Sequence, residues 1–483
     1  MNPYLVLGIV LGYFSILIGI SLLTSRKANS QTFFTGNRKS PWYVVAFGMV
    51  GTAISGVTFV SVPGEVGNSA FSYLQFIFGN IVGFWIVAAV LLPLYYRLNL
   101  VSIYTFLEQR FGYYSHKTGS FFFLISKLIG AAFRLFIVAV VLQIGFFDAF
   151  NIPFALTVTT TIGLVWVYTF RGGVKTIIWT DTLQTMFLII AVIFTIISIS
   201  KSFGWNSGTL INEIVNDSNS QIFFWDWRSG NNFFKQFISG MFITIVIVGM
   251  DQDMMQKNLT CRNIKDAQKN MVVFSFSFLA TVFLFLCLGA LLYIYAYKNE
   301  ITIPKNTDDL YPLLALNYFG LPVAIAFLLG IIAAAYSSAD SALTALTTSF
   351  SIDFLNIEKY EERKIQKIKR WSHLMFSALL IFVILLFKAI NNESIVVAVF
   401  RVAGYTYGPI LGLFVFGMYS KRIVKDKWVP VVAVISPVIC YFISKYSEII
   451  FNGYQFGFEL LILNGLITIS GLWVISKKHV LKT

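Results

Sequence analysis

One apolar stretch carries side chains that could bind a cation. Residues 331–344 read IIAAAYSSADSALT, and four polar residues stand where a membrane span would be apolar: Ser337, Ser338, Asp340 and Ser341. At 100° per residue these side chains fall within about 160° of one helix face. A carboxylate inside a bilayer is costly unless a cation or a polar partner compensates it. We therefore interpret this helix face as a candidate binding site.

A second acid lies in another apolar segment. Residues 171–184 read RGGVKTIIWTDTLQ, and Asp181 and Asp340 are the two acids deepest within apolar segments. Each of them could instead be capped or paired locally. Hard cations such as Na⁺ prefer oxygen ligands, which carboxylates and hydroxyls supply. Two such acids and a row of serines favour a cation site.

Two basic residues lie within the apolar segment 119–147. Arg134 is near its middle, and Lys127 is seven residues earlier on the same helix face. For Lys127 the sequence favours a side chain that extends to the cytoplasmic membrane surface. Arg134 is too deep for that. Its guanidinium could form an ion pair within the protein, or bind the carboxylate of a substrate through two parallel hydrogen bonds.

The elements that must position these residues are membrane-spanning helices. Of the 483 residues 57% are hydrophobic and only 12% are charged, with a mean hydropathy of +0.75, which excludes a soluble protein. An α-helix of about 20 apolar residues crosses a hydrocarbon core of about 30 Å. We predict an all-α polytopic membrane protein with about 13 transmembrane helices. The expected spans are 3–23, 43–64, 72–96, 119–147, 153–170, 176–200, 233–253, 271–297, 319–349, 371–389, 395–420, 427–447 and 457–475.

The net charge of +14 is a signal of topology. Most of the 36 lysine and arginine residues, Lys257 among them, fall in loops on one side of the predicted membrane. The positive-inside rule makes that side cytoplasmic. We expect a multi-pass protein of the inner (plasma) membrane with its N-terminus outside and its C-terminus inside, and no nucleic-acid partner. Asp251 and Asp253 then read as a solvated helix end balanced by nearby basic residues.

Two predicted spans contain helix-breaking residues. Segment 43–64 holds Gly48, Gly51, Gly56 and Pro63 among small polar residues, and segment 233–253 holds Gly240 and Gly249 before a polar GMDQD. Any one glycine could serve close helix packing. Interruptions at corresponding places in two halves are typical of inverted-repeat transporters, which bind substrate between their broken helices.

Four segments resemble the recurring motifs of the sodium/solute symporter family, which includes sodium-glucose, sodium-proline and sodium-sialic acid transporters. They are GGVKTIIWTDTLQ (172–184), GMDQDMMQKNL (249–259), AAAYSSADSAL (333–343) and GYTYGPILGLFVFG (404–417). The match runs in order from about residue 3 to residue 417.

The resemblance implies a ten-helix core with an inverted five-plus-five repeat, like that of the leucine transporter. The chain would divide into 1–40, a leading transmembrane helix and cytoplasmic linker; 41–420, the transport core; and 421–483, two C-terminal transmembrane helices and a short tail.

The resemblance also implies which residues bind Na⁺. A first site would use carbonyl and hydroxyl oxygens of Gly51, Ile54, Ala334, Ser337 and Ser338. A second site, present in only some members, would use Asp181, Ser337, Asp340 and Ser341. Asp340 replaces a hydroxyl residue of the sialic acid transporter, so it could strengthen cation binding or make the site protonatable.

Substrate contacts carry over less completely. Positions that line the pocket of relatives match Ala53, Ser55, Thr58 and Tyr73. Arg134 matches the arginine that holds the sialic acid carboxylate. Thr244 stands at the position of a sugar-binding asparagine, and Ile77 at that of an acid or amide, which argues against a sugar.

We therefore expect a Na⁺-coupled symporter that works as a monomer and imports a small organic anion, such as sialic acid or another carboxylate, by alternating access. A sugar or polyol is the alternative substrate, and a nutrient sensor that signals through a partner is an alternative function. We do not expect an enzyme, because the three histidines lie at helix ends or in loops and no metal or nucleophile set is evident.

Overall fold

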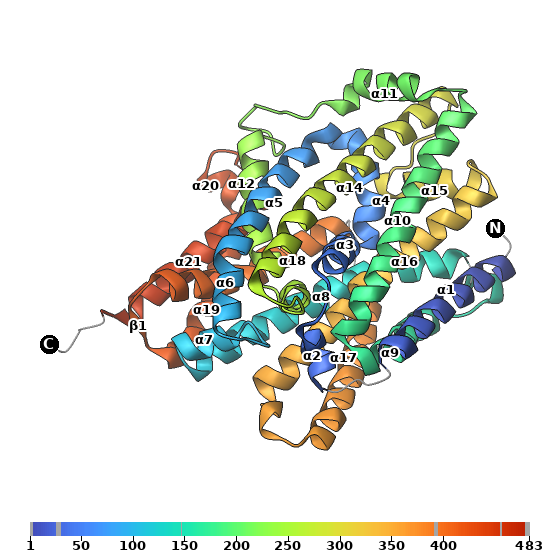
Figure 1. Cartoon of the computed structure of the whole chain (residues 1–483). Coiled ribbons are helices and arrows are strands. Elements are labelled where there is room, and N and C mark those ends of the chain that lie inside the picture. Colours follow the sequence, from blue (N-terminus) through green and yellow to red (C-terminus); the bar gives the residue numbers. More distant parts are fainter. Residues whose placement is uncertain (1–2, 26–29, 146, 391–394, 455, 479–483) are drawn as a thin grey trace.

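The computed structural model describes residues 3–25, 30–145, 147–390, 395–454 and 456–478. Helices dominate it, as lipid requires, because a helix satisfies its own backbone hydrogen bonds. Figure 1 shows long helices crossing at the centre of the molecule, with the N-terminal helix α1 on one side and the C-terminal helices α19 and α21 on the other.

The α-helices are α1 (Pro3–Thr24), α2 (Ser30–Thr35), α3 (Trp42–Ala53), α4 (Gly56–Ser69), α5 (Tyr73–Ile86), α6 (Leu92–Arg97), α7 (Thr105–Arg110), α8 (Tyr113–Gly145), α9 (Phe154–Gly172), α10 (Val174–Ser202), α11 (Ser207–Asn216), α12 (Phe233–Ile247), α13 (Gln252–Asn258), α14 (Ile264–Lys298), α15 (Leu310–Asn317), α16 (Leu321–Ser349), α17 (Glu362–Ile390), α18 (Ile395–Tyr419), α19 (Val429–Lys445), α20 (Ser447–Ile450) and α21 (Leu460–Val474).

Short 3-10 or π segments join or extend these helices: η1 (Gly36–Arg38), η2 (Ala70–Ser72), η3 (Val87–Leu91), η4 (Phe147–Phe150), η5 (Ser218–Ser220), η6 (Thr307–Asp309), η7 (Phe350–Phe354), η8 (Ile357–Lys359) and η9 (Asp426–Trp428). Two short strands, β1 (Ile423–Val424) and β2 (Ser476–Lys477), pair antiparallel and tie the C-terminal end to the loop after α18.

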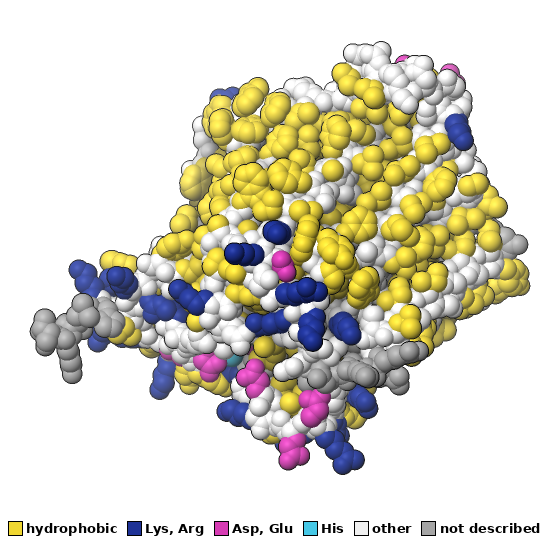
Figure 2. Space-filling model, viewed as in Figure 1, with side chains coloured by type: hydrophobic (Ala, Val, Ile, Leu, Met, Phe, Trp, Pro, Cys, Tyr) yellow, Lys and Arg dark blue, Asp and Glu magenta, His cyan; other side chains and the backbone are white. Residues whose placement is uncertain are grey.

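The helices form a multi-pass membrane protein. Within the described residues, nine helices are long and apolar enough to cross a membrane, and the bent pair α12 and α13 makes a tenth. Shorter apolar helices are Trp42–Ala53, Phe154–Thr169 and Leu460–Val474. Figure 2 shows hydrophobic side chains over the middle of the visible face, with Lys and Arg side chains gathered at one end of the molecule. We call this the basic end.

The first predicted helix interruption lies between α3 and α4. Ile54 and Ser55 have extended backbone conformations (φ −90°, ψ 94° and φ −77°, ψ 169°). The Ser55 hydroxyl caps α4 by accepting a hydrogen bond from the Thr58 backbone N–H (3.3 Å). A break of this kind leaves the last carbonyl groups of α3 without helical partners.

The second predicted interruption separates α12 from α13, which meet at 72°. The Tyr95 and Tyr104 hydroxyls donate to the carbonyl oxygens of Gly249 (2.7 Å) and Met250 (2.8 Å), so the carbonyls freed by the break are satisfied. Asp251 caps α13 by accepting from the Asp253 N–H (2.8 Å). All seven residues of α13 are buried, so the chain turns back into the protein here.

Glycines allow the closest helix contact described in the molecule, between α5 and α12. A Cβ atom added to Gly79 would lie 1.9 Å from the Phe237 carbonyl oxygen, and one added to Gly240 would lie 2.1 Å from the Phe76 carbonyl oxygen. Only glycine permits backbones to approach this closely. The pair α5–α12 therefore packs as a unit beside the second interruption.

Candidate cation and substrate site

The candidate cation residues lie where α3, α10 and α16 pack together at the centre of the molecule (Figure 1). A Cβ atom added to Gly51 would lie 2.3 Å from the Thr185 hydroxyl, so the missing side chain lets α3 approach α10. From Gly330 to Ser349 every residue of α16 is buried. The hydroxyls and the acid of this stretch therefore face protein on all sides.

Asp181 joins the three helices. Its side chain is fully buried on α10. One carboxylate oxygen accepts a hydrogen bond from the Ser337 hydroxyl of α16 (2.5 Å), and the other accepts from the Thr52 hydroxyl of α3 (2.9 Å). The structure thus brings together Asp181 and Ser337, which lie 156 residues apart and which the sequence assigns to one site.

A lysine lies among these groups. Lys257 of α13 is only 2% exposed, and its Nζ donates to an Asp181 carboxylate oxygen (2.6 Å), to the Ser341 hydroxyl (2.6 Å) and to the Thr52 hydroxyl. The sequence-based placement of Lys257 in a cytoplasmic loop is wrong, because α13 continues inward after the break. The available signal was local: the DMMQKN stretch after GMDQ can form two helical turns rather than a loop.

Asp340 faces a different helix. It is fully buried and accepts hydrogen bonds from the Tyr168 hydroxyl of α9 (2.8 Å) and from its neighbour Ser341 (3.3 Å). Ser341 in turn accepts from Lys257. Asp340 and Asp181 are therefore connected through Ser341 and Lys257.

The residues of the expected first Na⁺ site lie beside this cluster. The Ser338 hydroxyl is within 3.4 Å of the Thr52 carbonyl oxygen and 3.3 Å of the Ala334 carbonyl oxygen, so α16 contacts the end of α3 here. Ile54, just beyond that end, is fully buried. The C-terminal end of a helix carries a partial negative charge, which favours a cation.

A second buried charge cluster corrects two interpretations of the sequence. Lys127 of α8 does not extend to the membrane surface, and Asp251 and Asp253 are not a solvated helix end. The Lys127 ammonium lies 2.7 Å from an Asp253 carboxylate oxygen and 3.3 Å from an Asp251 carboxylate oxygen, and all three side chains are buried. The Tyr407 hydroxyl of α18 also donates to Asp251 (2.5 Å). The 72° bend explains both errors, because it keeps the end of α12 inside the protein.

Arg134 has no such partner. Within the part of the chain that the structure describes, its half-buried guanidinium makes no hydrogen bond or ion pair, although Asp253 and Tyr407 are near enough to interact with it electrostatically. Val138, one helical turn further along α8, would contact a Cβ atom added to Gly56 at 3.3 Å. The face of α8 that carries Arg134 therefore packs against the start of α4.

The other expected substrate residues fall in two places. Ser55 and Thr58 lie at the first interruption, where their hydroxyls are 3.3 Å apart, next to the half-buried Ala53. Tyr73 and Thr244 instead belong to the α5–α12 pair. Thr244 packs against α5, since a Cβ atom added to Gly83 would lie 2.8 Å from the Thr244 Cβ.

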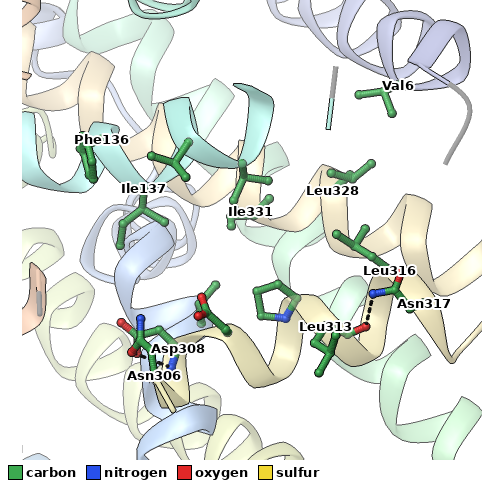
Figure 3. Close-up of a pocket in the computed structure, with 15 residues that line it drawn as sticks. Val6, Phe136, Ile137, Asn306, Asp308, Leu313, Leu316, Asn317, Leu328 and Ile331 are labelled. Atoms are coloured by element: carbon green, nitrogen blue, oxygen red, sulfur yellow. Dashed lines mark hydrogen bonds between the residues drawn. The ribbon is translucent and has the colours of Figure 1, made fainter. Parts of the chain in front are cut away.

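A cavity of about 560 Å³ opens between α1, α4, α8, α15 and α16. Figure 3 shows the apolar side chains of Ile137 and Ile331 on one side and the polar side chains of Asn306 and Asp308 on the other. Burial raises the pKa of the Asp308 carboxyl in the loop before α15.

Helices α8 and α16 line the cavity and also carry residues of the candidate site. Ile137 lies three residues after Arg134 on α8, and Ile331 lies three residues before Ala334 on α16. One helical turn therefore separates the cavity wall from the candidate site on both helices. The loop before α15, α15 itself and Leu328 of α16 also form its wall.

Comparisons with known proteins agree with this arrangement. A family model described as the sodium:solute symporter family matches residues 33–426. The sodium/sialic acid symporter NanT of Aliivibrio fischeri is 25% identical over 416 residues, which cover 82% of this chain and 79% of the relative. The sodium/sialic acid symporter SiaT of Proteus mirabilis is 24% identical over 466 residues, covering 91% and 89%. The sodium-coupled monocarboxylate transporter 1 of Xenopus laevis is 26% identical over 436 residues, covering 86% and 67%.

Solved structures share the fold. A Na⁺-coupled sialic acid symporter in a substrate-bound outward-open state superposes with a TM-score of 0.82 at 18% identity and covers 98% of both chains. Mhp1, a nucleobase-cation-symport-1 family transporter, superposes in a closed conformation with a TM-score of 0.52 at 12% identity, covering 93% of this chain and 95% of Mhp1. The motifs around Asp181 and Asp340 lie inside the region that the family model matches. The chain belongs to the sodium:solute symporter family.

Proposed function

We propose that this protein imports a small organic anion together with Na⁺, the coupling ion of its family, and that Arg134 binds the carboxylate of the substrate. The observation that carries this proposal is the unpartnered guanidinium. Among the residues that the structure describes, Lys127 and Lys257 also lie near the site, and both contact carboxylates. A half-buried guanidinium without a hydrogen-bonded anion is costly inside a membrane protein, so a ligand that supplies the anion would complete the surroundings of Arg134.

The relatives support an anionic substrate. Two are named for sialic acid and one for monocarboxylates, and each of these substrates carries a carboxylate. In this chain Ala53, Ser55 and Thr58 lie at the interruption against which the Arg134 face of α8 packs. The substrate would bind there, and Tyr73 and Thr244 would contribute from the α5–α12 pair.

The Na⁺ site that we propose lies at the end of α3. Gly51, Ile54 and Ala334 would supply carbonyl oxygens, and Ser337 and Ser338 hydroxyls. Bound Na⁺ would hold α3 against α16 and so fix the interruption beside which the substrate binds. If Na⁺ raises the affinity for substrate in this way, substrate raises the affinity for Na⁺ by the same factor.

The whole chain would work by alternating access around this site. We propose about 13 spans, with a core of 41–420 that is built as an inverted five-plus-five repeat and is flanked by 1–40 and 421–483. The two interruptions, one in α3–α4 and one in α12–α13, are the expected mark of such a repeat. We place the basic end in the cytoplasm, the N-terminus outside and the C-terminus inside, and we propose that the monomer is the working unit.

Uptake by the purified protein in liposomes tests the role of Arg134. Sialic acid, a short monocarboxylate and a neutral sugar are offered under an inward Na⁺ gradient. We expect uptake of a carboxylate by the wild type, a loss of at least tenfold in Arg134→Ala, and partial recovery in Arg134→Lys, which keeps the charge but not the paired hydrogen bonds. Arg228→Ala is the matched control, because Arg228 is exposed in the loop before α12.

Two outcomes would contradict the proposal. Unchanged carboxylate uptake in Arg134→Ala would exclude the guanidinium as the anion ligand. Na⁺-driven uptake of the sugar without any carboxylate would replace the substrate class while leaving Na⁺ symport intact.

A further inference from the structure

We propose that the ammonium group of Lys257 occupies the second cation site permanently in place of a second Na⁺, so that this protein couples one Na⁺ to each substrate. The proposal deepens the proposed function and rests on Na⁺ symport through the first site. Oxygen atoms of Thr52, Asp181 and Ser341 accept hydrogen bonds from the Lys257 ammonium group. The Ser337 hydroxyl donates to Asp181.

The geometry fits an ammonium ion. An ammonium group has three N–H donors, and each finds one acceptor: the Thr52 hydroxyl, the Asp181 carboxylate (2.6 Å) and the Ser341 hydroxyl (2.6 Å). The group is therefore fully satisfied. Its charge compensates that of Asp181, with which it forms a buried ion pair.

The hydroxyl groups are oriented for a cation at this point. Thr52 and Ser337 donate to Asp181, and Ser341 donates to Asp340. These hydroxyl hydrogens thus point at carboxylates. The lone pairs of Thr52 and Ser341 are left for the ammonium group, as they would be for a metal cation.

Na⁺ and the ammonium group exclude each other here. A Na⁺ ion in the expected second site would need the Asp181 and Ser341 oxygens that accept from Lys257. Two positive charges held a few ångströms apart in a buried site also repel each other strongly. A second Na⁺ could bind only if Lys257 left, and its departure would place an unpaired ammonium in a buried region.

The Lys257 ammonium group also links helices that come from the two interrupted segments. Lys257 belongs to α13, whereas Thr52, Asp181 and Ser341 belong to α3, α10 and α16. The ammonium group therefore holds the segment after the second interruption against the helices of the first. A mobile ion would form such a bridge only when it is bound, whereas Lys257 is part of α13 and can form it without Na⁺.

Equilibrium binding of radioactive Na⁺ to the purified full chain counts the sites directly. We expect one Na⁺ per wild-type chain. In Lys257→Ala the vacated oxygens and the uncompensated Asp181 should bind a second Na⁺. The double variant Asp181→Asn/Lys257→Ala removes both charges and should return to one Na⁺, and Lys257→Arg, which keeps a cation in place, should also bind one.

Each result decides the proposal. Two Na⁺ bound to the wild type would overturn it, whether or not any variant folds. One Na⁺ bound to a folded Lys257→Ala, judged by its unfolding temperature, would also overturn it, because the amine would not be what excludes the ion. No Na⁺ bound to the wild type would instead contradict Na⁺ symport itself, so the two failures are distinguishable.

Transport provides a second readout. One Na⁺ with a monovalent anion moves no net charge, so wild-type accumulation should not respond to an inside-negative potassium diffusion potential. Two Na⁺ would move one positive charge, and the same potential would raise accumulation on the order of tenfold or more. A potential-driven rise in the wild type would contradict the proposal, and a rise confined to Lys257→Ala would support it.

Discussion

Two buried lysines pair with aspartates on helices that are distant in the sequence. Asp181 pairs with Lys257, 76 residues away, and Lys127 pairs with Asp251, 124 residues away. The sequence was enough to recognise Asp181 and Asp340 as intramembrane acids, because residue type and apolar context reveal them. It could not supply their partners, since pairing depends on how α13 is directed after the 72° bend.

The Lys127 cluster should matter for stability. Lys127→Met leaves Asp251 and Asp253 buried without their cation, and breaking a buried pair in this way typically costs about 3–5 kcal/mol. The matched control is Lys298→Met, which removes an exposed pair with Glu213 (2.8 Å) of a kind worth about 0–1 kcal/mol. Unfolding in detergent should show a marked loss for the first variant and little change for the second. Equal losses would show that Lys127 does not stabilise the two carboxylates.

At the scale of elements, the two helix interruptions were predictable, and their geometry was not. Glycines and small polar residues in 43–64 and 233–253 mark the breaks because they weaken the helix locally. The direction taken after each break depends on side chains elsewhere, such as Tyr95 and Tyr104, which satisfy the freed carbonyls of the second break. A local pattern contains no information about such partners. For this reason the sequence predicts a loop where the structure has α13.

The α5–α12 contact gives a test at this scale. Gly79→Ala would place a methyl group 1.9 Å from the Phe237 carbonyl oxygen, so the two helices must separate. Overpacking of this kind costs typically about 1–3 kcal/mol. Gly130→Ala on α8 is the control, because a Cβ atom there meets nothing within 4 Å and alanine favours a helix. We expect a lower unfolding temperature for Gly79→Ala only. Similar behaviour of both variants would mean that the α5–α12 backbones are not in close contact.

For the whole molecule, composition and charge were sufficient to predict a multi-pass helical protein with one basic end. The four motifs were sufficient for the family. The structure adds that α13, the segment after the second interruption, is buried throughout. Composition cannot reveal this, since it says which segments enter the membrane but not how they close against one another.

Cys261, which follows α13, should report on opening at the basic end. It is fully buried, and burial together with the charge of Asp266 raises the pKa of its thiol to about 12. At pH 7 to 8 little thiolate is therefore present, and maleimide should react slowly. With Cys287 and Cys440 replaced by alanine, we expect labelling to be slow in saturating Na⁺ and faster without Na⁺, where the basic end opens more often. A cysteine at the exposed position Lys421 is the control and should label equally in both conditions.

Labelling of Cys261 should also rise with pH towards its raised pKa, because only the thiolate reacts. Fast labelling at pH 7 in saturating Na⁺ would show that the basic end is not closed under these conditions.

The proposed activity is uptake of an organic anion through this chain, driven by a Na⁺ gradient. The most direct measurement follows accumulation of radiolabelled carboxylate in liposomes that contain the purified protein, with Na⁺, K⁺ or H⁺ as the only imposed gradient. We expect accumulation above the external concentration with an inward Na⁺ gradient alone, and its collapse when an ionophore equalises Na⁺. Equal uptake with K⁺, or accumulation that follows the H⁺ gradient without Na⁺, would show that Na⁺ is not the coupling ion.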